Sequence, residues 1–208
     1  MAVTGIAMLG FVIVHMLSNL KAFLSPESLD HYAAWLRSFL DGLFGHEGFL
    51  WVARIGLVAC VVLHIAAAVG LARRARAARP TGYRHRAKVQ GGYAARTMRW
   101  GGVIIALFIV YHLLDLTAGY LNPHGVPGEV YRNVVADFQF WYVTLAYTLA
   151  IVALGFHIRH GLWSGFQSLG VSNAARQRSL KLVAAGVAVF ITIGYLSVPF
   201  AVLTGILR

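Results

Sequence analysis

Five apolar stretches dominate the sequence, and each is close to the roughly 20 residues that a helix needs to cross a bilayer core. In approximate bounds they are residues 3–24, 50–72, 100–121, 140–163 and 182–207. Because lipid offers the backbone no hydrogen-bond partners, spans of this length must be helices. The sequence therefore predicts an all-α fold, a single domain over residues 1–208 that forms an integral membrane bundle of five transmembrane helices.

The composition excludes other classes of protein. Of the 208 residues, 59% are hydrophobic and only 12% are charged, and the mean hydropathy is +0.69. A soluble domain carries about 25% charged residues, so these values exclude a soluble globular protein and a disordered chain. The single cysteine, Cys60, excludes a disulfide framework and an iron–sulfur cluster held within this chain. A bound metal would have to be held mainly by nitrogen.

Two connecting segments are predicted to be helices that lie on the membrane surface. The first starts at Ser25, a favourable N-cap, with Pro26 at the first helical position and apolar side chains from Leu29 to Leu43 on one face. The second, a weaker case, covers residues 129–137. The first span lacks the basic start and the cleavage site of a secretory signal, so we expect a retained helix.

The charges separate the two ends of the predicted bundle. Thirteen of the eighteen Lys and Arg residues lie between spans two and three, between spans four and five, or close by, and every acidic residue lies at the other end. By the positive-inside rule, the N-terminus is cytoplasmic and the C-terminus is outside. The net charge of +11 thus reflects topology rather than nucleic-acid binding, although a basic inner surface could also dock an acidic soluble partner.

Histidines occur in each of the first four predicted spans, at His15, His64, His112 and His157. Ionisable side chains at membrane depth are costly and therefore suggest function. At 1.5 Å per residue, His15 and His112 lie roughly 18 Å from the inner ends of their spans, and His64 and His157 roughly 12 Å. Two histidines at equal depth on facing helices can take both axial positions of one haem iron. The pattern predicts two stacked haems.

Other interpretations of these histidines stay open. A single membrane histidine is more often a packing contact between helices, and only the fourfold pattern favours haem. Zinc is less favoured, because no His-Glu-x-x-His run or carboxylate accompanies the histidines at these depths. His160 lies three residues after His157 on the same helical face, so it competes for the ligand role or bonds a haem propionate.

The residues around these histidines resemble a known family, the five-helix, two-haem cytochrome b anchor subunit of succinate dehydrogenase and fumarate reductase. The resemblance covers nearly the whole chain and is most specific in the fourth span. It rests on His15-x-x-x-Asn19-Leu20, His64, Phe108-x-x-x-His112-Leu113-Leu114-Asp115, and His157-x-x-His160-Gly161-Leu162-Trp163-Ser164 followed by Gln167-Ser168-Leu169-Gly170.

The resemblance implies a multi-pass subunit of a bacterial inner membrane that holds two haem b groups and uses menaquinone. Its partners would be a flavoprotein subunit and an iron–sulfur subunit on the cytoplasmic side, with no nucleic acid. In the family, the first and third helices hold one haem and the second and fourth hold the other, in agreement with the pairing by depth. On this match His157 is the ligand and His160 lies beside it. Succinate would be oxidised in another subunit.

The same resemblance suggests residues around the haems. Arg73, Arg99 and Arg159 lie near the inner ends of the spans and could pair with propionates, although anchoring at the interface explains each of them as well.

Two other functions of the protein stay open: a cytochrome b subunit of a hydrogenase or formate dehydrogenase type complex, and a haem-free membrane transporter.

Quinone chemistry couples electrons to protons, so its site should have a titratable group in reach. Asp115, one helical turn outward of His112, is the best candidate, and Lys21 at similar depth could be its partner. An ordinary ion pair near the lipid headgroups explains these two residues equally well. Glu47 and His46 are weaker candidates for carrying protons to the outer water.

Overall fold

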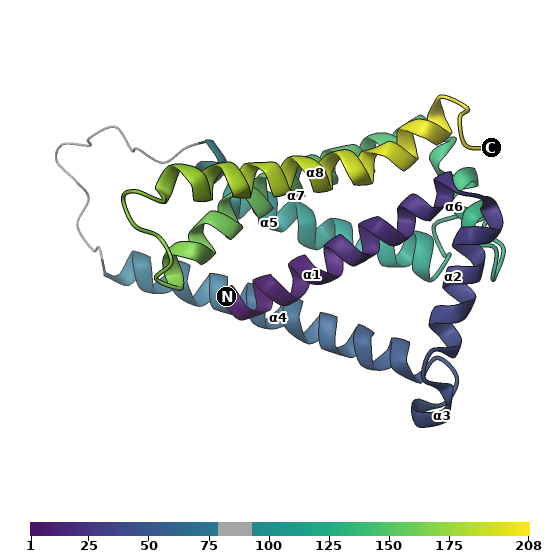
Figure 1. Ribbon diagram of the computed structural model, residues 1–208, viewed down its shortest axis with the longest axis horizontal. Coiled ribbons are helices and arrows are strands. Elements are labelled where there is room, and N and C mark those ends of the chain that lie inside the picture. Colours follow the sequence, from purple (N-terminus) through teal and green to yellow (C-terminus); the bar gives the residue numbers. More distant parts are fainter. Residues whose placement is uncertain (79–92) are drawn as a thin grey trace.

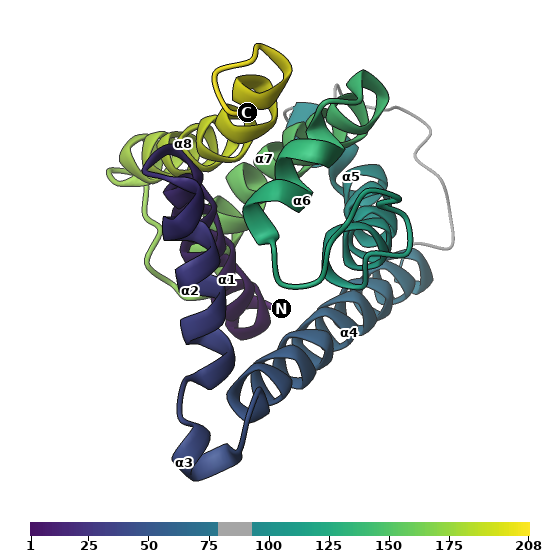
Figure 2. The ribbon, with the colours of Figure 1, turned by 90° about the vertical axis from the view of Figure 1, so that its right-hand side faces the viewer.

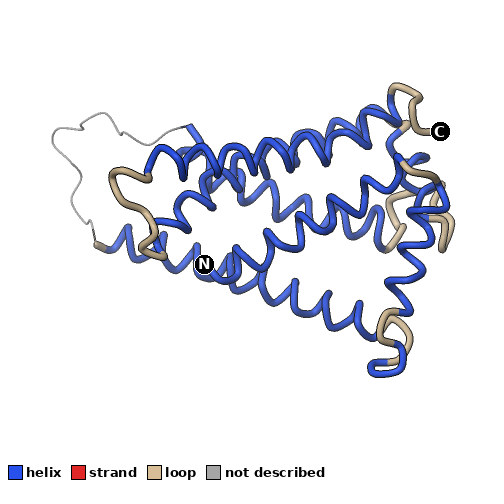
Figure 3. Tube along the Cα trace, viewed as in Figure 1, coloured by secondary structure: helices blue, strands red, loops and turns tan. Residues whose placement is uncertain are grey.

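A computed structural model describes residues 1–78 and 93–208 of the chain, without the side chains of residues 93–97. Of the described residues, 81% are helical and none lies in a strand (Figure 3). Five long helices run along the bundle in alternating directions (Figure 1). They are α1 (Ala2–Asn19), α4 (Gly48–Ala77), α5 (Tyr93–His112), α7 (Trp141–Ser168) and α8 (Gln177–Leu203). Each is long and apolar enough to cross a membrane, which confirms the predicted all-α fold.

Shorter elements gather at one end of the bundle, which we term the capped end (Figures 1 and 2). They are η1 (Leu20–Phe23), α2 (Pro26–Ser38), α3 (Asp41–Phe44), the π-helical turn η2 (Leu113–Thr117) and α6 (Val130–Phe138). The C-terminus lies at this end. The opposite end, where α4 and α7 finish and α5 and α8 start, is termed the basic end (Figure 1). Its exposed cations include Arg73, Arg74, Arg76, Arg176 and Arg178.

The tightest packing is among α1, α7 and α8. Thr192 on α8 occupies the space where a Cβ at Gly155 of α7 would lie, and Met16 on α1 does the same at Gly194 of α8. Small residues let membrane helices approach closely. Met16 is fully buried as a result, with Ile191 at 1% exposure beside it.

α4 packs differently from the other long helices. It contacts α1 along the bundle and α2 and α3 at the capped end, and it crosses one side of the molecule in Figure 2. All 30 residues of α4 are described, and none of them is buried. This helix therefore carries apolar side chains on every face without a dense protein core around it.

The local predictions are confirmed in part. Ser25 caps α2 through its hydroxyl, which accepts from Ser28 N at 3.1 Å. The prediction that one helix carries the apolar residues from Leu29 to Leu43 is wrong. The helix α2 ends at Ser38, and Leu40 has a φ of 61° before α3 begins. The third span ends at Thr117 rather than at residue 121, because the helix widens into the π-turn and Gly119 then takes a φ of 73°.

The second predicted surface helix forms as α6, which buries one face and exposes Arg132 on another. Its Tyr131, Val135, Asp137 and Phe138 are all buried. α6 packs against α2, α7 and α8 and so covers the end of the core (Figure 2). This position brings α6 over the end of the third span.

Candidate functional site

The four span histidines meet in two pairs. His15 on α1 faces His112 on α5, with ring centroids 6.0 Å apart and ring planes at 72°. His64 on α4 faces His157 on α7, with centroids 6.2 Å apart and planes at 55°. The structure therefore brings together the residues that the helix depths paired, and each pair joins two different helices.

The two pairs lie at separate levels of the bundle. Thr4 on α1 contacts His64, and His15 lies eleven residues farther along α1, about 16 Å away by helix rise. Gly102 on α5 lies beside His157, and His112 lies ten residues farther along α5, about 15 Å.

This separation corrects the predicted difference in depth, which was only about 6 Å. The helix ends are staggered, so they do not share a common starting level. α4 continues for thirteen residues, about 20 Å, beyond His64, whereas α1 begins two residues before Thr4, at the level of His64.

The spacing within each pair fits two axial ligands of one metal. Two metal–imidazole bonds of about 2 Å, with about 1 Å more from each nitrogen to its ring centre, separate the centroids by about 6 Å. The described residues contain no group of three or more His, Cys, Asp or Glu that could hold a bare metal ion. A pair of imidazoles thus suits a metal whose other ligands come from a macrocycle, and it does not suit zinc, which needs three or four protein ligands.

A tyrosine orients the His15–His112 pair. Tyr147 on α7 donates its hydroxyl proton to Asp115 Oδ2 at 2.8 Å, and its oxygen lies 3.2 Å from His112 Nδ1. Because the phenol has only one proton, its oxygen accepts from His112 Nδ1–H. The Nε2 of His112 then keeps the lone pair that a metal requires.

A threonine plays the same part in the His64–His157 pair. Thr4 Oγ1 donates to Met1 O at 3.0 Å and lies 3.1 Å from His64 Nδ1. With its proton on the carbonyl, the hydroxyl accepts from His64 Nδ1–H, so His64 Nε2 is again the free nitrogen.

Two glycines line the same pair. A Cβ at Gly5 would lie 3.6 Å from His64 Cε1, and one at Gly102 would lie 3.8 Å from His157 Cε1. His157 Nδ1 is buried, and no described residue forms a hydrogen bond with it. Both glycines thus lie at ordinary contact distance from the edges of the two imidazoles.

His160 does not face His64. Its ring contacts Trp163, with centroids 6.0 Å apart and planes at 73°. Trp163 Nε1 is buried and has no hydrogen-bond partner in the described part of the chain, and Lys181 Nζ lies 4.9 Å from a Trp163 ring centroid. The geometry therefore favours His157 over His160 as the member of the pair, and it places His160 with Trp163 on the side of the basic end.

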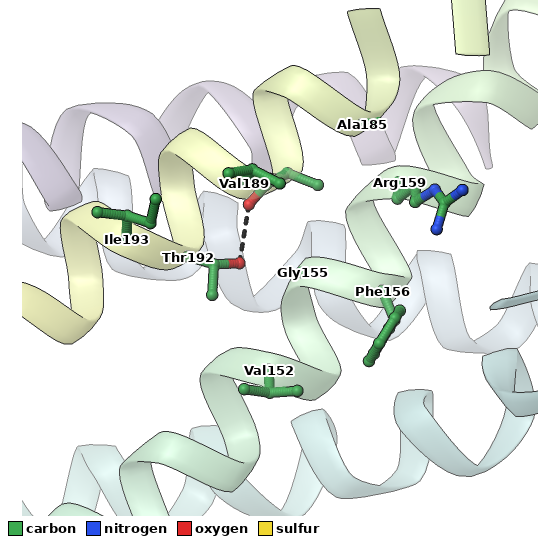
Figure 4. A pocket seen from close by; sticks show the side chains of 9 residues that line it. Val152, Gly155, Phe156, Arg159, Ala185, Val189, Thr192 and Ile193 are labelled. Atoms are coloured by element: carbon green, nitrogen blue, oxygen red, sulfur yellow. Dashed lines mark hydrogen bonds between the residues drawn. The ribbon is translucent and has the colours of Figure 1, made fainter. Parts of the chain in front are cut away.

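The predicted propionate partners differ in position. Arg159 follows His157 by two residues, about 200° around α7, so it leaves the helix on nearly the opposite side. It lines a groove of about 250 Å³ between α7 and α8, with Val189 and Ile193 (Figure 4). Arg159 is therefore a poor propionate partner. Arg73 and Arg99 are exposed at the basic end, where either role remains open.

The predicted ion pair between Lys21 and Asp115 is not formed. Lys21 Nζ lies 5.5 Å from the ring centroid of Tyr32, because η1 turns it toward α2. Asp115 is 1% exposed and bonds Tyr147 instead. Its second neighbour is Asp137 on α6, which lies within hydrogen-bonding reach.

His46 and Glu47 lie apart from the histidine pairs, beside α3 at the far corner of the capped end from α6 (Figure 2). His46 Nδ1 is 3.5 Å from Asp41 Oδ2, and Glu47 Oε1 is 3.4 Å from Arg37 Nε. These ion pairs join the segment between α2 and α4 and do not touch the buried acids.

Three residues of the site escaped the sequence analysis: Thr4, Tyr147 and Asp137. A hydroxyl that falls opposite a span histidine is a usable signal, but it requires knowing which helices face each other. Asp137 gave no signal, because a carboxylate at the end of a short amphipathic helix is ordinarily solvated. Here burial, and next the charge of Asp115, raise the pKa of Asp137 to about 7.

Comparison with known proteins gives one family. The model of the succinate dehydrogenase/fumarate reductase transmembrane subunit matches residues 72–195, more than half of the chain. The matched segment contains one histidine of each pair, together with both buried acids. No curated protein and no solved structure matches the chain.

Proposed function

The chain belongs to the succinate dehydrogenase/fumarate reductase transmembrane subunit family, and from that premise we propose that it is a two-haem b anchor that carries electrons between an iron–sulfur subunit and menaquinone. Membership makes it a membrane subunit of an oxidoreductase complex. The dicarboxylate site then lies in another subunit. The single observation that carries the haem proposal is the meeting of four histidines, two by two, at 6.0 and 6.2 Å.

Each residue of the proposed sites has a defined task. His15 and His112 would hold one haem, and His64 and His157 the other; bound haem iron supplies one-electron transfer. Tyr147 holds His112 in the tautomer with a free Nε2.

The second site has its own supporting residues. Thr4 holds His64 in the corresponding tautomer, and Gly5 and Gly102 leave room at the imidazole edges. The apolar helices around both pairs limit access of water, which is one of the means by which a protein sets a haem potential.

The charge distribution supports a direction for the electron path. The basic end carries exposed arginines on α4 and α8, and by the positive-inside rule it faces the cytoplasm. An acidic face of the iron–sulfur subunit would dock there, with the flavoprotein subunit behind it. The His64–His157 pair is nearer this end, so electrons would reach it first and pass about 15 Å along the bundle to the His15–His112 pair.

Menaquinone would exchange electrons near the His15–His112 pair. Supporting this position are the two buried acids at the same end, because quinone reduction and quinol oxidation need proton carriers. Asp115 is closed off from solvent and lies behind Tyr147. Asp115 would therefore exchange protons with the quinone through neighbouring residues, without touching the quinone itself.

Purification of the intact complex from its native membrane tests this function. We expect a flavin-bearing, succinate-oxidising partner, an iron–sulfur partner and a reduced-minus-oxidised spectrum with b-type bands from two haems per chain. A spectrum without b-type bands in undamaged protein would contradict the haem proposal and favour a transporter. A nickel or molybdenum enzyme as the partner would contradict the proposed assembly.

A further inference from the structure

Two buried carboxyl groups at the capped end have no role in holding a metal. Asp115 on η2 is 1% exposed and Asp137 on α6 is 3% exposed. The two groups lie within hydrogen-bonding reach of each other. Two carboxylates at this distance in a low dielectric repel each other strongly, so they do not both stay ionised at neutral pH.

The neighbouring hydroxyls decide which group carries the charge. Tyr147 donates to Asp115 Oδ2 at 2.8 Å, and the Tyr111 hydroxyl also reaches Asp115. Hydrogen bonds from phenols favour a charged acceptor. Among the residues that the structure describes, no phenol donates to Asp137. Asp115 is therefore the carboxylate of the pair, and Asp137 is the acid.

The remaining oxygens point to a shared proton. Asp115 Oδ1 and Asp137 Oδ2 are buried, and neither has a hydrogen-bond partner among the described residues. Buried polar atoms are nearly always paired, because an orphan has lost its hydrogen bonds to water without a replacement. One proton held between the two carboxyl groups gives both residues the bond that they lack.

The elements that pack around α6 bring no cation to the pair. Asp30 on α2 accepts from Tyr131 N at 2.9 Å, and Arg208 beyond α8 donates Nε to Gly205 O at 2.8 Å. On α7 and α5 the titratable neighbours are tyrosines. Among the described residues, no Lys, Arg or His forms an ion pair with Asp115 or Asp137. Within the described part of the chain, a proton is thus the positive charge that can serve the pair.

This pair is connected to one of the candidate metal ligands. The Tyr147 hydroxyl donates a hydrogen bond to Asp115, and its oxygen accepts a hydrogen bond from His112 Nδ1–H. A negative charge at Asp115 strengthens both bonds and makes the imidazole a stronger donor to a metal. A proton shared between Asp115 and Asp137 weakens that effect.

We infer that Asp115 and Asp137 hold one exchangeable proton between them, and that Tyr147 links this proton to the charge of the metal held by His112. The second clause rests on the proposed function. One electron delivered from the iron–sulfur subunit adds one negative charge at the His15–His112 site. In molecules whose pair has lost this proton, as happens when pH rises through about 7, the Asp115–Asp137 pair then takes one proton from water, and its charge falls from two negative charges to one. Loss of the electron releases that proton.

The acid pair is testable without any haem. Asp137 has a pKa raised from 3.8 to about 7, so its contribution to folding is present at low pH and is lost as pH rises through about 7. We expect the wild-type chain, purified in detergent, to lose thermal stability between about pH 4 and 7 relative to Asp137→Asn. Glu129→Gln, at the same end, should follow the wild type, because the exposed Glu129 carboxylate pairs with Arg132, which stays charged over this pH range. Identical pH profiles for wild type and Asp137→Asn would overturn the shared proton.

The link to the metal is tested on the intact complex by redox titration at several pH values. We call the haem proposed at the His15–His112 pair the outer haem and the one proposed at the His64–His157 pair the inner haem. We expect the midpoint potential of the outer haem to fall as pH rises around 7 in wild type and Glu129→Gln, and to lose this slope in Asp137→Asn. Asp115→Asn should lose this pH dependence of the midpoint potential as well. This variant replaces Asp137→Asn in the test if Asp137→Asn does not assemble. Two haems with a slope unchanged in both variants would overturn the link while leaving the proposed function intact. Absence of haem would instead refute the proposed function.

Discussion

Thr4 Oγ1 on the first turn of α1 lies 3.1 Å from His64 Nδ1 on α4, although the two residues are 60 positions apart in the sequence. The contact places the start of α1 at the level of the His64–His157 pair. It also fixes which nitrogen of His64 is free. A hydroxyl therefore supports a metal ligand from a different helix, which is a usual arrangement around protein-bound metals.

Replacing Thr4 tests this support. Thr4→Val keeps the shape of the side chain but removes the acceptor for His64 Nδ1–H, so we expect the inner haem to bind about 10- to 100-fold more weakly. Haem retention during dilution in detergent measures the loss. Thr4→Ser keeps a hydroxyl and should retain the haem. Equal retention by Thr4→Val and wild type would show that the contact does not hold the ligand.

The sequence sufficed for the pairing of the histidines because position along a helix follows directly from residue number. The sequence did not suffice for the distance between the two histidine pairs along the bundle, because the start of α1 and the end of α4 are staggered. His157 and His160 could not be separated by spacing alone, since both face similar directions on α7. The observed contacts with His64 and Trp163 distinguish them.

Asp137 and Lys21 show where sequence reasoning fails for a physical reason. Asp137 is buried because α6 folds back over η2, a long-range packing event that its own amphipathic pattern does not encode. Lys21 shares its approximate depth with Asp115, but depth does not give direction around a helix. The η1 turn directs Lys21 to Tyr32.

Tyr147 should be needed for the outer site. Tyr147→Phe removes the bond to Asp115 and the acceptor for His112 Nδ1–H, so we expect loss of about 1–3 kcal/mol of stability from the unsatisfied buried carboxyl. Outer haem retention should also fall. Thermal unfolding and the b-type spectrum measure the two effects. Tyr120→Phe is a matched control, because Tyr120 is 82% exposed. A Tyr147→Phe variant indistinguishable from Tyr120→Phe would contradict the assignment.

Gly102 should limit the size of side chain beside the inner site. A Cβ there lies 3.8 Å from His157 Cε1, an ordinary contact, so Gly102→Ala should keep the inner haem. The larger Gly102→Leu should displace it, because its branched end must occupy the space next to the imidazole. Gly10→Leu on α1 is the control, since nothing lies within 4 Å of a Cβ at Gly10. Two haems in Gly102→Leu, counted by pyridine haemochrome, would show that no macrocycle lies beside Gly102.

The most direct measurement is the haem content of His157→Ala beside His160→Ala, read from reduced-minus-oxidised spectra of the purified complex. His157 faces His64 and His160 faces Trp163, so His157→Ala should lose the inner haem and keep the outer one. His160→Ala should keep both haems and only shift the potential of the inner one. Loss of the inner haem in His160→Ala with its retention in His157→Ala would contradict the account.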